Sequence, residues 1–260
     1  MLLIKIAVTI IIVTGMSIVA ERVSPRAAGI LSGYPLGTAI SLFFIGMEQG
    51  PAYAGASALY AVAGMAALLS FLYCYYLGSV RVQRFSILAG SLAAIGGFLV
   101  VDGLLLALPL PAWASLLIAG GAILGFGVLF RGIPNAKIAN RIRLGPKVLF
   151  FRASLAALII VGIIGAAKIV PASLAGLFSA FPSTVFPLVL IIHHTYGPKQ
   201  AHTIIKNLPT GLWSLVLYTL TISFAYPRLG IYWGTLAGYV IATLYLLGLA
   251  AVQWNKKRDK

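Results

Sequence analysis

Charged residues are scarce in this sequence. Only 9% of its 260 residues are Asp, Glu, Lys or Arg, whereas 61% are hydrophobic and the mean hydropathy is +1.03. A soluble domain carries roughly a quarter charged residues, so this composition excludes a soluble globular protein. The apolar runs are long and continuous rather than short and alternating, which favours transmembrane helices. We therefore expect an all-α, polytopic membrane helix bundle.

Acidic residues and cysteine are rarer still. The only acids are Glu21, Glu48, Asp102 and Asp259, and Cys74 is the only cysteine. This excludes an internal disulfide and the spaced cysteine motifs of metal or redox sites, so we expect no metal and no cofactor. No phosphate loop, nucleophile elbow or pair of catalytic carboxylates is present, and we do not expect an enzyme.

Positive charge is abundant, with a formal net charge of +15. A nucleic-acid partner would need a basic face with base-reading or stacking residues. The Lys and Arg residues instead lie in short connections between apolar runs, which argues against nucleic acid and points to the lipid bilayer as the surrounding medium.

Nine segments are long enough to cross a hydrocarbon core of ~30 Å as helices. The first resembles a cleavable signal peptide, but its length and its alignment with an internal segment favour a membrane span. The nine expected spans are 2–20, 28–48, 52–77, 86–108, 112–131, 148–168, 172–194, 204–226 and 230–252.

The Lys and Arg residues fall mainly on one side of this topology. If the spans alternate, three of them (Lys5, Lys168 and Arg228) share the side of the N-terminus, and the other sixteen lie opposite. Because cytoplasmic loops carry the excess of Lys and Arg, we expect a protein of the cytoplasmic membrane with its N-terminus outside and its C-terminus in the cytoplasm.

A single offset of 147 residues aligns the first part of the chain with the last part. It places Pro35 on Pro182 and Gly50-Pro51 on Gly197-Pro198. Since an odd number of spans separates the copies, the second copy is expected to be inverted. We expect two inverted four-helix repeats joined by a linker helix: 1–110 as the first repeat, 111–147 as the linker helix and basic loop, 148–255 as the second repeat, and 256–260 as a basic tail.

The second span of each copy carries proline in its middle. Proline removes a backbone donor and clashes with the preceding turn, and in lipid the freed carbonyls need new partners. Matched Gly/Pro-interrupted spans indicate a transport site near the midplane, although proline also simply bends membrane helices. The candidate residues of these two spans are Pro35, Ser32, Thr38, Ser41, Pro182, Pro187, Ser179, Ser183 and Thr184.

Ionisable residues near the spans form a second set of candidates. Asp102 lies within a span, where a carboxyl is costly and indicates function; alternatively it is neutral and bonded to a neighbouring helix. Glu48 lies on the same side and would line an outward vestibule with Asp102, or be solvated. His193 and His194 end a span and would gate or relay protons, or anchor the interface. The run from Phe71 to Tyr76 is expected to be an interfacial aromatic belt.

The stretch 28–35, followed by Ser41-Leu42-Phe43-Phe44 and Glu48-Gln49-Gly50-Pro51, resembles the core of small four-span bacterial membrane proteins of the GlpM type. The resemblance covers about 25 residues in each half and implies that each half corresponds to one such protein. The second half has Thr195 in place of Glu48. The layout is also similar in plan to small drug/metabolite-type transporters.

These observations predict a small, proton-coupled secondary transporter of unknown substrate, either a small solute or a lipid. Two alternatives remain open: a non-catalytic membrane-embedded partner or assembly subunit, acting as a homodimer or with another membrane protein, and a flippase for a lipid or polyprenyl carrier.

Overall fold

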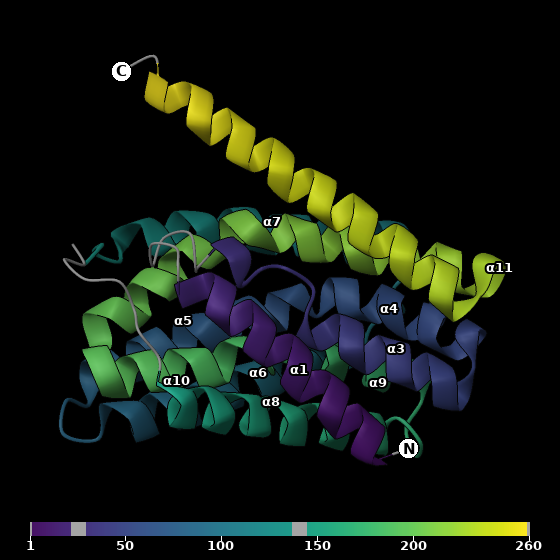
Figure 1. Ribbon diagram of the computed structural model, residues 1–260, viewed down its shortest axis with the longest axis horizontal. Helices are drawn as coiled ribbons and strands as arrows, with labels where there is room; N and C mark the ends of the chain where they lie inside the picture. The colour runs from purple at the N-terminus through teal and green to yellow at the C-terminus, as the bar shows by residue number, and fades with distance from the viewer. Residues whose placement is uncertain (1, 22–29, 137–144, 259–260) are drawn as a thin grey trace.

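The computed structural model describes residues 2–21, 30–136 and 145–258, together with the side chains of 3–15, 30–136 and 145–252. Every regular element in these ranges is helical, so the expectation of an all-α bundle is confirmed for them (Figure 1). The elements are α1 (Leu2–Glu21), α3 (Gly37–Gln49), α4 (Pro51–Ala63), α5 (Met65–Arg81), α6 (Ser86–Leu106), α7 (Ala112–Leu129), the 3-10 helix η1 (Phe130–Gly132), α8 (Pro146–Ala166), α9 (Ala172–Ser179), α10 (Val185–Tyr196) and α11 (Pro198–Arg258).

Glycine followed by proline separates helices at two equivalent places. Gly50 and Gly197 both have a φ of 92°, a conformation that glycine adopts without steric cost. Pro51 opens α4 and Pro198 opens α11, because proline fits the first position of a helix. Each glycine thereby ends one helix and lets the chain turn directly into the next.

α11 is a helical hairpin rather than one straight helix. Gly230 has a φ of 76° and interrupts the helical backbone there. The C-terminal arm turns back at this point (Figure 1), and the rings of Tyr218 and Tyr239 lie 5.0 Å apart across the two arms. The hydroxyl of Tyr245 donates to the carbonyl of Thr210 at 3.0 Å. The two arms therefore run antiparallel.

The number of individual membrane-length helices is smaller than the nine expected. Among the described residues, α6, Ala112–Gly132, α8 and α11 are each long and apolar enough to cross a membrane, and α4 with α5, bent by 44° at Gly64, would make five. Leu3–Gly15 and Val185–Tyr196 are apolar but shorter. The difference arises because glycine and proline divide several expected spans, and because α11 contains two of them, one in each arm on either side of the interruption at Gly230.

Small residues allow the helices of the interior to pack closely. Gly176 of α9 lies against the carbonyl of Ser57 in α4, and Gly211 of α11 lies against the carbonyl of Ile30. A Cβ at either glycine would collide with that backbone. Close backbone approach at small residues is how helices associate in lipid, so these contacts fix the positions of α4, α9 and the first arm of α11.

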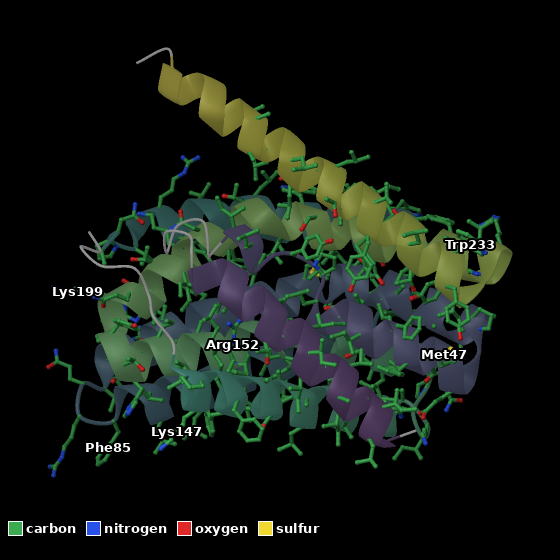
Figure 2. All side chains as sticks on the ribbon, viewed as in Figure 1. Met47, Phe85, Lys147, Arg152, Lys199 and Trp233 are labelled. Carbon is green, nitrogen blue, oxygen red and sulfur yellow. The ribbon has the colours of Figure 1, made fainter. Side chains whose placement is uncertain are left out.

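The two ends of the bundle differ in charge. Phe85, Lys147 and Lys199 lie at one end, whereas Met47, Trp233 and the start of α1 lie at the other (Figures 1 and 2). We call the end with Phe85, Lys147 and Lys199 the basic end. Arg81, the last residue of α5, also lies beside it. Apolar side chains are exposed between the two ends, as a multi-pass membrane protein requires.

Candidate functional site

Both spans expected to be interrupted are broken at equivalent places. The first is irregular from Ser32 to Leu36 and contains Pro35, and the second is irregular from Ala180 to Thr184 and contains Pro182. Both prolines are buried. Three pairs of backbone hydrogen bonds, each pair 147 residues apart, frame the breaks: Gly33 N to Ile30 O and Ala180 N to Leu177 O, Tyr34 N to Leu31 O and Phe181 N to Phe178 O, and Leu36 N to Tyr34 O and Ser183 N to Phe181 O.

The two breaks meet in the interior of the bundle. Gly37, the first residue of α3, lies directly against the Oγ of Ser183, and a Cβ there would also approach the methyl group of Thr184 within 3.3 Å. Gly37 and Thr184 are themselves 147 residues apart. The broken helices thus cross at positions that the sequence offset makes equivalent, and only glycine leaves room for the crossing.

Buried hydroxyl groups surround this crossing. Thr38, Ser41, Ser179, Ser183 and Thr184 are all buried. Ser179 donates to the carbonyl of Ala175 at 2.7 Å, but the Oγ atoms of Ser41 and Ser183 have no hydrogen-bond partner in the described part of the chain. Because Ser41 follows Gly37 by four residues, it shares the face of α3 that meets Ser183. Buried polar atoms normally have partners, so the crossing has unused hydrogen-bonding capacity.

The first break has hydroxyl groups from α11 as neighbours. The Oγ of Ser214 donates to the carbonyl of Gly33 at 2.9 Å, and the hydroxyl of Tyr239 donates to the carbonyl of Pro35 at 3.4 Å. Tyr34 and Thr243 share a hydrogen bond of 2.9 Å. These contacts supply the partners that the carbonyls of an interrupted helix need in an apolar environment.

The second break has aromatic rings instead. Phe181 lies edge-on to Phe71, Phe98 and Phe186, with ring centroids 5.3, 5.1 and 6.2 Å away. By the offset of 147, Phe181 corresponds to Tyr34 and Phe71 corresponds to Tyr218. One break is therefore bordered by hydroxyl groups and the other by phenyl rings, although their backbones match.

Asp102 lies apart from the contacts that define the crossing. It is 3% exposed in α6, and neither of its carboxylate oxygens has a hydrogen-bond partner among the described residues. Its neighbour Leu105 packs with Ala63 of α4 and Leu177 of α9. The alternative of an Asp bonded to a neighbouring helix is thus not what the structure shows. Burying a carboxyl without hydrogen-bond partners is costly.

Glu48 is neither solvated nor paired with Asp102. Its Oε1 lies 2.5 Å from the Nζ of Lys5, and its Oε2 lies 3.5 Å from the Nζ of Lys168. The Lys5 side chain is only 7% exposed. This ion triad connects α1, α3 and the segment after α8. This ion triad was not predicted from the sequence, because Lys5 and Lys168 were used only to infer the orientation of the protein in the membrane.

His193 belongs to a buried polar cluster, whereas His194 is exposed. The Nδ1 of His193 lies 2.9 Å from the hydroxyl of Tyr75, and its Nε2 lies 3.2 Å from the Oγ of Ser86. The ring of His202 lies 6.1 Å from that of His193 and bonds Ser79 at 2.8 Å. The histidine whose ring lies next to that of His193 is therefore His202, whereas the side chain of His194 is exposed.

Tyr75 was expected at the interface but is fully buried. The signal that identifies it is its position in α5, four residues before Ser79, which places both hydroxyl groups on one helix face. No group of three or more His, Cys, Asp or Glu able to hold a metal occurs among the residues described.

Comparisons with protein-family models, with curated proteins and with solved structures gave no match.

Proposed function

We propose that the protein is a small secondary transporter of the cytoplasmic membrane, with its site at the crossing of the two broken helices. The observation that carries this proposal is the contact of Gly37 with Ser183, at equivalent breaks with matching backbone hydrogen bonds. Interrupted helices meeting at the interface of two repeats supply substrate sites in many transporters. The unpartnered Oγ atoms of Ser41 and Ser183 would bind the substrate.

The proposal includes nine passes through the membrane and two inverted repeats. Two observations support it: the matching φ angles of Gly50 and Gly197, and the antiparallel arms of α11, which supply two of the nine passes. Gly50 lies at the end of α3 next to Met47, and Gly197 lies next to Lys199 at the basic end (Figure 2). Equivalent glycines at opposite ends are the arrangement that an inverted repeat requires.

Proton coupling is assigned in this proposal to Asp102. Its carboxyl is buried and has no described partner, so binding or releasing a proton would change the charge of a low-dielectric region by one unit. Rocking of one repeat against the other would expose the crossing alternately to the two sides of the membrane.

Thiol labelling tests alternating exposure without knowledge of the substrate. Cys74 is the only cysteine, so Cys74→Ala gives a background without thiols, into which Ser41→Cys or Ser183→Cys is introduced. We expect a membrane-impermeant maleimide to label both sites from either side, in right-side-out and in inverted vesicles. Trp233→Cys and Phe85→Cys, exposed at opposite ends, are controls that should each be labelled from one side only.

Labelling of Ser41→Cys and Ser183→Cys from a single side, or from neither side in a monodisperse protein, would reject the crossing as an alternately exposed site. A thermal-shift screen of the purified protein against solutes and lipids identifies the substrate class in parallel. The solute that protects the crossing from maleimide is the expected substrate.

A further inference from the structure

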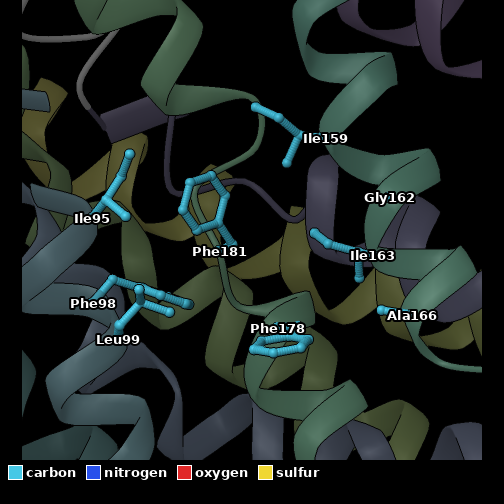
Figure 3. A pocket seen from close by; sticks show the side chains of 9 residues that line it. All are labelled: Ile95, Phe98, Leu99, Ile159, Gly162, Ile163, Ala166, Phe178 and Phe181. Carbon is cyan, nitrogen blue, oxygen red and sulfur yellow. The ribbon is translucent and has the colours of Figure 1, made fainter. Parts of the chain in front are cut away.

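A wholly apolar groove lies between α6, α8 and the second break (Figure 3). It has a volume of about 340 Å³ and is open along one side. Phe98 and Ile163 form its buried part, and Leu99, which is 55% exposed, forms part of its rim. Phe181, in the break of the second span, also lines it. No polar side chain lines this groove, so an apolar occupant is favoured.

A second hollow lies at the N-terminal end of α6, at the basic end of the bundle. It has a volume of about 440 Å³, and its lining includes Arg84, Ser86, Ser91 and Leu190. Arg84 is exposed and stacks on Phe85 at 5.8 Å from the ring centroid. No described side chain caps α6, and Ser86, Ile87 and Leu88, whose backbone N–H groups have no partner within the helix, line this hollow. The guanidinium and these donors together favour an anion.

One face of α6 connects the two hollows. Leu88 and Ser91 line the hollow at the basic end, and Ile95 and Leu99 line the apolar groove. Their spacing of three and four residues places all four on the same side of the helix. From Ser86 to Leu99 the helix rises ~20 Å, which passes the middle of a hydrocarbon core of ~30 Å. An amphiphile with its head at Arg84 would therefore reach the groove with its chain.

We propose that this face of α6 binds an anionic phospholipid. The phosphate lies between Arg84 and the N-terminus of α6, and one acyl chain follows Leu88 and Ile95 into the apolar groove, ending against Phe181. The site goes beyond the proposed transport function and does not depend on it. It places a lipid chain against the backbone break that carries Pro182, so lipid occupancy and the geometry of that break are coupled.

Two glycines of α8 allow a matched test of the groove. Gly162 lines the groove and Gly165 does not, and neither has a described atom within 4 Å of an added Cβ. Gly162→Phe fills the groove without a collision with the backbone, and Gly162→Leu does so with less volume. Gly165→Phe adds the same side chain elsewhere on α8. Arg84→Gln tests the head group, with Arg81→Gln as the control at the same end.

The measurement is native mass spectrometry of the intact protein from mixed micelles containing phosphatidylglycerol and phosphatidylcholine with identical acyl chains. We expect about fivefold preferential retention of phosphatidylglycerol, because one cationic contact contributes about that factor. Arg84→Gln should remove the preference, and Gly162→Phe and Gly162→Leu should reduce retention of phosphatidylglycerol severalfold. Arg81→Gln and Gly165→Phe should behave as the wild type.

Equal retention of the two lipids by the wild type, or unchanged retention in both Gly162 variants, would overturn the proposal. A copurifying protein or a second copy of the chain in the spectrum, in place of lipid, would also overturn it. The thiol-labelling result at the crossing is independent, so failure of one proposal leaves the other standing.

Discussion

At the scale of single residues, the two carboxyl groups near the spans have opposite environments. Glu48 lies between two lysines, one of them almost fully buried, whereas the oxygens of Asp102 have no described partner. Breaking a buried ion pair leaves an uncompensated charge, which is strongly destabilising. Neutralising a carboxyl without partners removes no hydrogen bond. Glu48 therefore balances buried positive charge, whereas the carboxylate of Asp102 makes no hydrogen bond among the described residues.

We expect Glu48→Gln to lower the free energy of unfolding by about 3 kcal/mol, because Lys5 remains buried without its counter-charge. The double variant Lys5→Met with Glu48→Gln should recover most of the loss. Thermal unfolding in detergent measures both effects. Glu48→Gln with an unchanged melting temperature would mean that the ion triad does not stabilise the protein.

Asp102→Asn should instead leave the melting temperature unchanged or raise it, and abolish proton-driven uptake in proteoliposomes of the solute found by thermal shift. Uptake at the wild-type rate would remove Asp102 from the coupling mechanism. This variant and Glu48→Gln are controls for each other, since each removes one carboxylate.

At the scale of helices, local sequence features predicted most of the points where the chain breaks, but not the bend at Gly64. Gly50-Pro51, Gly197-Pro198 and the prolines Pro35 and Pro182 act through their own backbone geometry, and all four mark helix ends or breaks in the structure. The partners of Lys5 and His193 were not predictable in this way. They depend on which helices pack together, and helix periodicity carries no information about that choice.

Alanine substitutions of glycines inside and outside helix contacts should change the free energy of unfolding in opposite directions. Gly211→Ala would force a methyl group into the backbone at Ile30, and we expect it to destabilise the protein by about 1–3 kcal/mol as an overpacked site. Gly121 of α7 has no described atom within 4 Å of an added Cβ. Gly121→Ala should be neutral or stabilising by up to about 1 kcal/mol, since alanine favours the helix.

Thermal unfolding of both variants under one condition decides the comparison. If Gly211→Ala is as stable as Gly121→Ala, the close contact between the first break and α11 does not hold the helices together. Gly64→Ala, whose Cβ would meet that of Ala180, is the equivalent change in the other half and should follow Gly211→Ala.

At the scale of the whole molecule, the charge difference between the two ends predicts orientation. The end with Phe85, Lys147 and Lys199 should face the cytoplasm, and the end with Met47 and Trp233 should face outward. In the Cys74→Ala background, Phe85→Cys should react with an impermeant maleimide only in inverted vesicles. Trp233→Cys should react only in intact cells or right-side-out vesicles. The reverse pattern would place the basic end outside.

The overall architecture was only partly visible in the sequence. Composition predicted an all-α structure with apolar helices of membrane-spanning length, because lipid requires every backbone group to be satisfied within its own segment, and the described residues contain such helices. The count of spans was harder, since 52–77 contains the bend at Gly64 and α11 holds two of the expected spans in its arms on either side of Gly230. By the offset of 147, Tyr34 corresponds to Phe181 and Tyr218 corresponds to Phe71. The structure shows that the two tyrosines lie by one break and the two phenylalanines by the other, which the sequence alone does not show.

The packing of α1 has a consequence for the order in which the helices assemble. α1 (Leu2–Glu21) lies against α8 (Pro146–Ala166), and its Lys5 is held by Glu48 and flanked by Lys168. Synthesis proceeds from the N-terminus, so the first helix enters the bilayer long before its main neighbour exists. Until Glu48 of α3 follows, Lys5 must remain near the lipid head groups or in the translocation machinery, because an unpaired lysine is costly in lipid. α1 thus leaves the ribosome well before α8 and can reach its final place only after α8 has been made.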